Sequence, residues 1–337
     1  MNVQKLESLP PPPGVIASLR AGFDAVSNHV GLILLPLALD VLLWLGPRLS
    51  VEGLLRPFFT LVFEQMRKSV DSAELDQFIR GQTEIMSRLQ DFNLFSLVTK
   101  LQTFPIGIFS LSAETLPVGT PFGVQIVMPV GSLPLLLVLS IIFILIGLIG
   151  GGLYYRLVAG TTLGEEETGI SLMRAIVQTF VLSLMWVIGL MVISMPILFL
   201  LFVLLLISPA LVNAAVIVML ILSFWLIIPL FFTPHGIFVR RQNALYSALS
   251  SLRLTRFTLP TSGMFVLSVF LLSRGLNYLW SVPPNQSWMM LVGIAGHAFI
   301  TTALLAASFV YYRDMNIWLQ TVFERLQQKQ SIPTQQL

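Results

Sequence analysis

Residues 234–260, PHGIFVRRQNALYSALSSLRLTRFTLP, lie between two long uncharged runs. The apolar side chains of this stretch recur at helical spacing and share one face: Leu245, Ala248, Leu249 and Leu252. Basic side chains flank that face: Arg240, Arg241, Arg253 and Arg256. A basic amphipathic helix between apolar spans is typical of a membrane surface, on the side where positive charge collects. The four arginines are therefore candidate contacts for anionic lipid headgroups, or alternatively residues that only set the membrane topology.

The composition of the whole chain indicates a membrane protein. Of its 337 residues, 55% are hydrophobic and only 10% are charged, against roughly 25% charged in soluble domains. Residues 175–239 contain no Asp, Glu, Lys or Arg. Because about 20 apolar residues cross a bilayer, that run is long enough for two spans and a turn. The predicted fold class is all-α and polytopic.

Six transmembrane helices are expected, arranged as three hairpins: 30–46, 133–155, 175–205, 211–232, 263–280 and 289–310. Residues 1–29 are predicted to form a tail and an interfacial helix, and 47–132 a helical extracytoplasmic region. Residues 133–314 carry the remaining spans with their cytoplasmic loops, and 315–337 form a C-terminal tail. The start of the chain lacks a basic leader and a small-residue cleavage site, so the first span is expected to be retained.

The distribution of charge predicts the orientation of the spans. The short turns near 206–212 and 282–288 carry no Lys or Arg, whereas the opposite loops are basic. Basic loops stay on the cytoplasmic side, so both termini are expected in the cytoplasm. The predicted location is the cell membrane of a prokaryote.

Residues 101–132 interrupt this pattern with four prolines and several glycines. Irregular backbone exposed to lipid is not tolerated inside the hydrocarbon layer. We therefore expect this segment to lie along the outer face of the membrane. The alternative is a re-entrant loop that is buried inside the protein.

Four polar side chains fall inside predicted spans and are candidates for function: Asp40, Arg274, Asn277 and His297. Intramembrane ionisable groups are costly unless they are paired or face water. Asp40 and Arg274 both lie about six residues from the outer ends of their spans, roughly 9 Å deep at 1.5 Å per residue. They could form a structural ion pair, belong to a substrate or proton path, or remain separate with Arg274 reaching the surface. His297 could relay protons or simply pack through a hydrogen bond.

Several classes of function are not indicated. The chain has no cysteine, and its other two histidines, His29 and His235, fall far from His297 along the predicted spans, so no metal cluster is expected. Phosphate-binding loops, nucleophile elbows and dinucleotide fingerprints do not occur. The net charge of +3 reflects basic loops and gives no sign of nucleic-acid binding. No catalytic residue and no cofactor are predicted.

Residues 174–318 resemble the membrane domain found beside glycerophosphodiester phosphodiesterases and in related prokaryotic membrane proteins. The resemblance is carried by Ala244-Leu245-Tyr246-Ser247 through Leu252 before a span, and by Tyr311-Tyr312-Arg313-Asp314 after one. It covers less than half of the chain. The catalytic phosphodiesterase domain of that family has no counterpart here. The resemblance therefore implies a fold type and no reaction.

The sequence favours a non-enzymatic membrane component that interacts with lipids or acts as a scaffold. Its expected partners are membrane lipids, with another membrane protein or a second copy as further possibilities. The alternative is a small-solute transporter or permease that uses Asp40, Arg274 and His297. The two hypotheses differ in whether those residues line a water-accessible path or are sealed by packing.

Overall fold

The computed structural model describes residues 11–68, 75–99, 104–163 and 169–330. The chain divides into two compact units, with residues 1–30, 156–273 and 302–337 in the first and 31–155 and 274–301 in the second. The described residues are mainly helical, which confirms the predicted all-α class. Three helices continue from one unit into the other: α6 (Leu133–Gly160), α10 (Ala244–Trp280) and α11 (Met289–Gln330).

Five helices are long and apolar enough to cross a membrane. They are α6, α7 (Leu172–Ile207), α8 (Pro209–Phe231) continued by α9 (Thr233–Arg240), α10 and α11. A sixth is obtained if α1 (Val15–Asn28) forms one broken span with η2 (Val30–Ile33) and α2 (Leu34–Leu45). The coarse prediction of a multi-pass α-helical protein is therefore confirmed. The hairpin order and the sidedness of the termini stay predictions.

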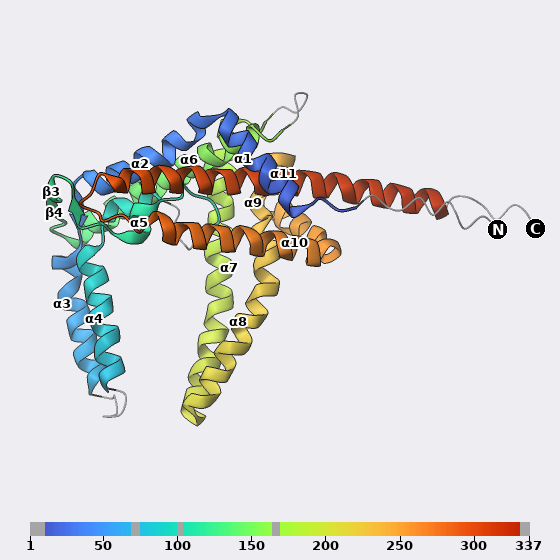
Figure 1. The fold of residues 1–337 in the computed structure, drawn as a ribbon. Coiled ribbons are helices and arrows are strands. Elements are labelled where there is room, and N and C mark those ends of the chain that lie inside the picture. Colours follow the sequence, from blue (N-terminus) through green and yellow to red (C-terminus); the bar gives the residue numbers. More distant parts are fainter. Residues whose placement is uncertain (1–10, 69–74, 100–103, 164–168, 331–337) are drawn as a thin grey trace, which may run out of the picture. The chain divides into compact units, whose positions relative to one another are not determined.

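In the first unit, α7 and α8 form an antiparallel hairpin that Figure 1 shows in yellow-green and yellow. Leu, Ile, Val and Phe side chains are exposed on all sides of it, as expected for helices whose solvent is lipid. The core of this unit lies elsewhere, where Phe232, Phe265, Tyr311 and Tyr312 pack together. Helix α1 joins this core: a Cβ on Gly22 would lie 2.4 Å from the backbone nitrogen of Ala307 in α11.

The predicted interfacial helix and the predicted fifth span are one helix with a break. Within α10, Thr258 has non-helical angles of φ −123° and ψ 16°. Two residues later Pro260 lacks the N–H that a regular helix uses, and its ring crowds the preceding turn. Leu245, Leu249 and Leu252 are exposed, as the apolar face of a helix on a membrane surface would be. The buried face of this part of α10 carries several hydroxyl groups, those of Ser247, Ser251, Thr255 and Thr258, beside Ala244 and Leu254.

The second unit contains α2, α3 (Glu52–Arg67), α4 (Leu75–Asp91), η3 (Leu94–Val98) and α5 (Leu111–Thr115). Short strands were not predicted in this region, but four are present. The strand β1 (Arg48–Ser50) pairs in parallel with β4 (Val127–Pro129), and β2 (Gly119–Thr120) pairs antiparallel with β3 (Gly123–Val124). Helices α3 and α4 form a conventional amphipathic hairpin with Phe59, Phe63 and Phe78 between them.

Residues 104–112 are packed inside the second unit rather than spread over its surface. Ile106, Ile108 and Leu111 are buried. A Cβ on Gly151 of α6 would lie 2.7 Å from Cα of Gly107. An irregular segment against two apolar helices fits the re-entrant alternative, in which protein satisfies the backbone. Whether residues 101–132 lie along the outer face of the membrane or re-enter it stays a prediction; residues 100–103 lie outside the described part.

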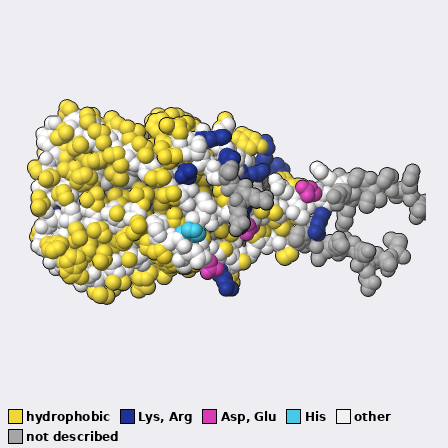
Figure 2. Space-filling model, turned by 90° about the horizontal axis from the view of Figure 1, so that it is seen from above, with side chains coloured by type: hydrophobic (Ala, Val, Ile, Leu, Met, Phe, Trp, Pro, Cys, Tyr) yellow, Lys and Arg dark blue, Asp and Glu magenta, His cyan; other side chains and the backbone are white. Residues whose placement is uncertain are grey.

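Hydrophobic side chains dominate the face drawn in Figure 2, and Lys and Arg side chains gather in one part of it.

Candidate functional site

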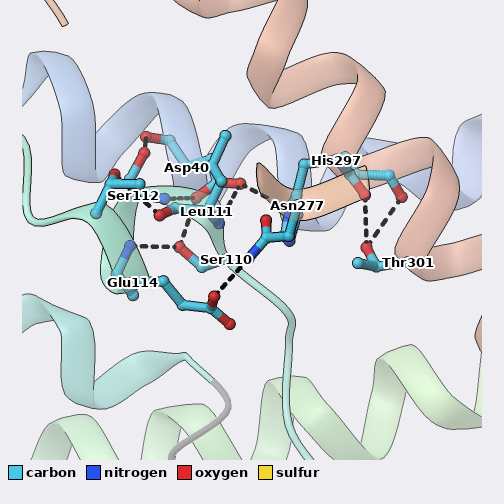
Figure 3. A network of polar contacts seen from close by, with 11 residues as sticks. Asp40, Ser110, Leu111, Ser112, Glu114, Asn277, His297 and Thr301 are labelled. Carbon is cyan, nitrogen blue, oxygen red and sulfur yellow. Dashed lines mark hydrogen bonds and ion pairs between the residues drawn. The ribbon is translucent and has the colours of Figure 1, made fainter. Parts of the chain in front are cut away.

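Asp40 lies on α2 with an accessible fraction of 0%. Its neighbours along the helix are apolar, so its side chain must find polar partners from another element. These partners come from residues 110–112, at the start of the short helix α5 (Figure 3). A segment about 70 residues distant in the chain is therefore held against α2 by a buried carboxylate.

Three groups donate hydrogen bonds to the Asp40 carboxylate. The Ser110 hydroxyl and the Ser112 amide donate to Oδ1, and the Leu111 amide donates to Oδ2 at 3.1 Å. The Ser112 hydroxyl also donates to the main-chain oxygen of Asp40 at 3.1 Å. Hydrogen bonds to a charged acceptor are stronger than neutral ones. These donors satisfy the carboxyl oxygens of the buried Asp40 side chain from within the chain.

His297 of α11 approaches the same carboxylate. Its Nδ1 lies 3.7 Å from Oδ2 of Asp40, and its side chain is almost fully buried. That distance exceeds a hydrogen bond but permits an ion pair when the imidazole is protonated. In the described part of the chain, Nδ1 has no hydrogen-bond partner. Thr301 binds the backbone of the same turn, donating to the His297 carbonyl at 2.7 Å.

Asn277 of α10 extends this polar cluster at one side. Its Nδ2 donates to Oε2 of Glu114, and Glu114 belongs to α5 (Figure 3). Arg274 lies one turn earlier on α10. The sequence left open whether Arg274 pairs with Asp40; in the structure the partners of Asp40 are the serine segment and His297. Three of the four predicted intramembrane residues thus belong to one polar cluster.

The arrangement is closed rather than reactive. Ser, His and Asp are present, but Ser110 donates its proton to the carboxylate instead of facing the imidazole, and its oxygen accepts from the Ala113 amide. A nucleophilic serine needs a base at its own hydroxyl and access to substrate. Both Asp40 and Ser110 are buried. Among the described residues no group of three or more His, Cys, Asp or Glu is arranged to hold a metal ion.

An open groove lies in the first unit, where two of the predicted lipid contacts meet. It has a volume of about 260 Å³. Six of its lining residues are basic or polar: Arg240, Arg253, Gln242, Ser250, Asn316 and Gln320. The other five are apolar or aromatic: Tyr246, Leu254, Phe257, Leu319 and Phe323. Its described lining contains no acidic side chain, so its local potential is positive.

Most of this groove is built by α10 and α11, with Arg240 of α9 and Gln242 beside them. The amino-terminal part of α10 supplies Arg253 and Phe257, and α11 supplies Asn316 and Phe323. Nη1 of Arg240 donates to Oδ1 of Asn316 at 3.0 Å, which holds one guanidinium in the lining. The rings of Phe257 and Phe323 meet edge to face at 5.5 Å. The α10 wall is fixed from behind, because Ser247 and Ser251 donate to the carbonyls of Thr233 and Pro229.

The other two predicted lipid contacts lie outside the groove lining. Arg241 ends α9 in a left-handed conformation (φ 53°), and its carbonyl accepts a hydrogen bond from Arg174. Arg256 is exposed on α10. A second hollow, in the second unit between α4 and α5, has charges of both signs, including Arg80, Glu84, Asp91 and Glu114. Its mixed lining favours neither anions nor cations.

Sequence reasoning missed Ser110, Ser112 and Glu114 in the closed cluster, and Asn316 and Gln320 in the groove. The serines stand between apolar residues, a weak signal that any turn would also give. Comparisons of the chain with protein-family models, with curated proteins and with solved structures returned no match.

Proposed function

We propose that the protein is a non-enzymatic, multi-pass component of a prokaryotic cell membrane that binds anionic lipid through the groove between α10 and α11. The observation that carries this proposal is the composition of the groove lining. It combines two arginines and several amides with leucine, tyrosine and phenylalanine side chains. A phospholipid offers the matching groups, with an anionic phosphate, a polar headgroup and acyl chains.

The arginine and amide side chains that line the groove suit a phosphate. Guanidinium groups bind phosphate oxygens through charged hydrogen bonds, and amides such as Gln242 and Asn316 can bind headgroup hydroxyls. The apolar wall formed by Leu254, Phe257 and Phe323 would contact the first part of an acyl chain. The resemblance to the membrane domain of glycerophosphodiester phosphodiesterases, untested by the comparisons, concerns the same part of the chain.

The transporter alternative receives less support. Transport through Asp40 and His297 requires a water-accessible path to them, yet both side chains are buried and Asp40 is saturated with donors. A flux assay in proteoliposomes with the wild type and Asp40→Asn separates the two functions. A solute flux in the wild type that Asp40→Asn abolishes, while the variant stays folded, would favour transport.

The lipid proposal is tested by measuring retained lipid on purified full-length protein by native mass spectrometry. Phosphatidylglycerol and phosphatidylcholine are offered in equal amounts. Arg240→Gln and Arg253→Gln should each weaken phosphatidylglycerol retention about fivefold, because a basic residue near a lipid surface contributes about 1 kcal/mol. Phosphatidylcholine retention should change little.

Arg256→Gln is the matched control, since it removes the same charge from the same helix but lies outside the groove lining. It should leave the tightly retained lipid unchanged. An equal loss for Arg256→Gln and Arg253→Gln would show that net surface charge, and not the groove, determines lipid binding.

A further inference from the structure

The β2–β3 hairpin of the second unit displays apolar side chains that the described part of the chain leaves largely exposed. Its tight turn contains Phe122, and Gly123 adopts φ +110°, a conformation that side chains disfavour. The accessible fractions of Phe122, Val124 and Ile126 are 78%, 79% and 72%. Residues 115–155 contain no Asp, Glu, Lys or Arg.

The polarity of this segment is inverted relative to a strand that faces water. Gln125 stands between Val124 and Ile126, and its accessible fraction is 6%. Its Nε2 donates to the carbonyls of Leu43 and Trp44 at 2.9 and 2.7 Å, satisfying the carboxyl-terminal end of α2. Gln125 and Ile126 lie between β3 and β4. The accessible fractions show that the polar side chain points inward and that the apolar ones on either side of it point out.

The hairpin is held rigidly in this orientation. The Arg48 amide donates to the Ile126 carbonyl at 2.8 Å, next to the parallel pairing of β1 with β4. Behind the turn, Trp288 meets both Phe122 and Trp44 edge to face, at 5.3 and 6.0 Å. Trp44 is fully buried, so this aromatic series runs from the core of the unit to the tip of the hairpin. The exposed apolar residues are thus a displayed surface and not a loose end.

We propose that the β2–β3 hairpin, residues 119–126, inserts with Trp288 into the interfacial layer of the bilayer. Two observations select lipid as the occupant. The exposed apolar surface continues directly into the exposed face of α6, a candidate membrane span, at Leu133, Leu137 and Ile141. Inverted polarity with apolar side chains outside is the pattern of strands in contact with lipid, and exposed tryptophan is enriched at membrane interfaces.

This inference does not depend on the groove in the first unit. It assigns a second lipid contact, in which an apolar hairpin is immersed without recognising a particular headgroup. Loss of phosphatidylglycerol binding at Arg253 would leave it intact, and failure of hairpin insertion would leave the groove intact.

The absence of cysteine from the chain allows a direct test, since each introduced cysteine is a unique labelling site. Phe122→Cys, Val124→Cys and Ile126→Cys are labelled with an environment-sensitive fluorophore in the full-length protein. Ser87→Cys, exposed on the charged helix α4, is the control in the same unit. All are placed in nanodiscs of phosphatidylcholine and phosphatidylglycerol, which leave both membrane faces open to solutes.

Labels on the hairpin should show blue-shifted emission, strong quenching by lipids with doxyl groups near the headgroup, and loss of quenching by aqueous iodide. The label at residue 87 should show the reverse. Iodide quenching at residues 122, 124 and 126 equal to that at 87 would overturn the proposal. So would protection that persists in detergent together with cross-linking between labelled copies, because the occupant would then be a second copy. Three sites guard against a single variant that misfolds.

Discussion

The closed cluster around Asp40 and the open groove at Arg253 differ in how their charged side chains are partnered. Asp40 is buried and receives three hydrogen bonds from its own chain. The groove exposes two arginines next to an apolar wall, and no acidic residue lines it. A charge with its full set of internal partners has no affinity left for a ligand, whereas a charge facing an open hollow does. The comparison assigns structure to the first region and binding to the second.

From the sequence, Asp40 is the stronger candidate for a functional residue and the basic stretch the weaker one. Asp40 stood out because it is a charge inside an apolar run, which is the usual signature of a functional site in a membrane protein. The basic stretch stood out less, because arginines at an inner membrane surface are expected in any topology. The structure reverses this ranking. The Asp40 carboxylate is bound by groups of its own chain, whereas the arginines of the basic stretch face an open groove.

The largest expected effect tests the closed cluster. Asp40→Ala leaves the Ser110 hydroxyl and two backbone amides without an acceptor, and removes the carboxylate next to the His297 ring. Breaking a buried charged network of this kind costs about 3–5 kcal/mol. Thermal unfolding of the purified protein in detergent should show a large loss of stability.

Asp24→Ala is the control for that measurement. Asp24 pairs with Arg20 at 3.8 Å, and both side chains are well exposed. Its loss should change the free energy of unfolding by no more than about 1 kcal/mol. If Asp40→Ala and Asp24→Ala had the same small effect, the cluster would not hold α5 against α2, and its structural role would be wrong.

A smaller effect separates the members of the cluster. Ser112→Ala keeps the amide that binds the carboxylate and removes only the hydroxyl bound to the Asp40 carbonyl. The expected loss is about 1 kcal/mol. Thermal unfolding should therefore show a much smaller loss of stability for Ser112→Ala than for Asp40→Ala. A loss as large as that of Asp40→Ala would mean that the main-chain contact, not the carboxylate, holds the segment.

The helices and the polar residues inside them could be predicted from sequence, because hydropathy and composition act locally. Residues 175–239 contain no charged residue, so this run alone predicts membrane-spanning helices without information from the rest of the chain. Asp40 and His297 were identified for the same reason. Their partners could not be, since Ser110 and Ser112 reach Asp40 only through the packing of residues 104–112.

The strands and the groove were beyond prediction for related reasons. The strands are two or three residues long and depend on pairing between segments far apart, as between Arg48 and Val127. The inward hydroxyls of α10 look like an ordinary polar face in sequence, and only the contacts of Ser247 and Ser251 show that this face is buried. Which of the four arginines line a groove depends on α11, whose Asn316 and Gln320 follow some 60 residues later.

The smallest expected effect on stability belongs to the groove, and it sharpens the comparison most. Arg253 is an exposed side chain, so Arg253→Gln should change the unfolding free energy by less than about 0.5 kcal/mol in lipid-free detergent. The difference should appear when lipid is added. A ligand that binds only the folded state raises its stability in proportion to the logarithm of ligand concentration over the dissociation constant.

Added phosphatidylglycerol should therefore raise the melting temperature of the wild type and of Arg256→Gln, and raise that of Arg253→Gln much less. Asp40→Ala should keep its response to lipid while starting from a lower melting temperature, because its defect lies in the other unit. A variant of Arg253 that is destabilised without lipid would place this arginine among the structural contacts. If Asp40→Ala lost the response to lipid and Arg253→Gln kept it, lipid binding would belong to the Asp40 cluster and not to the groove.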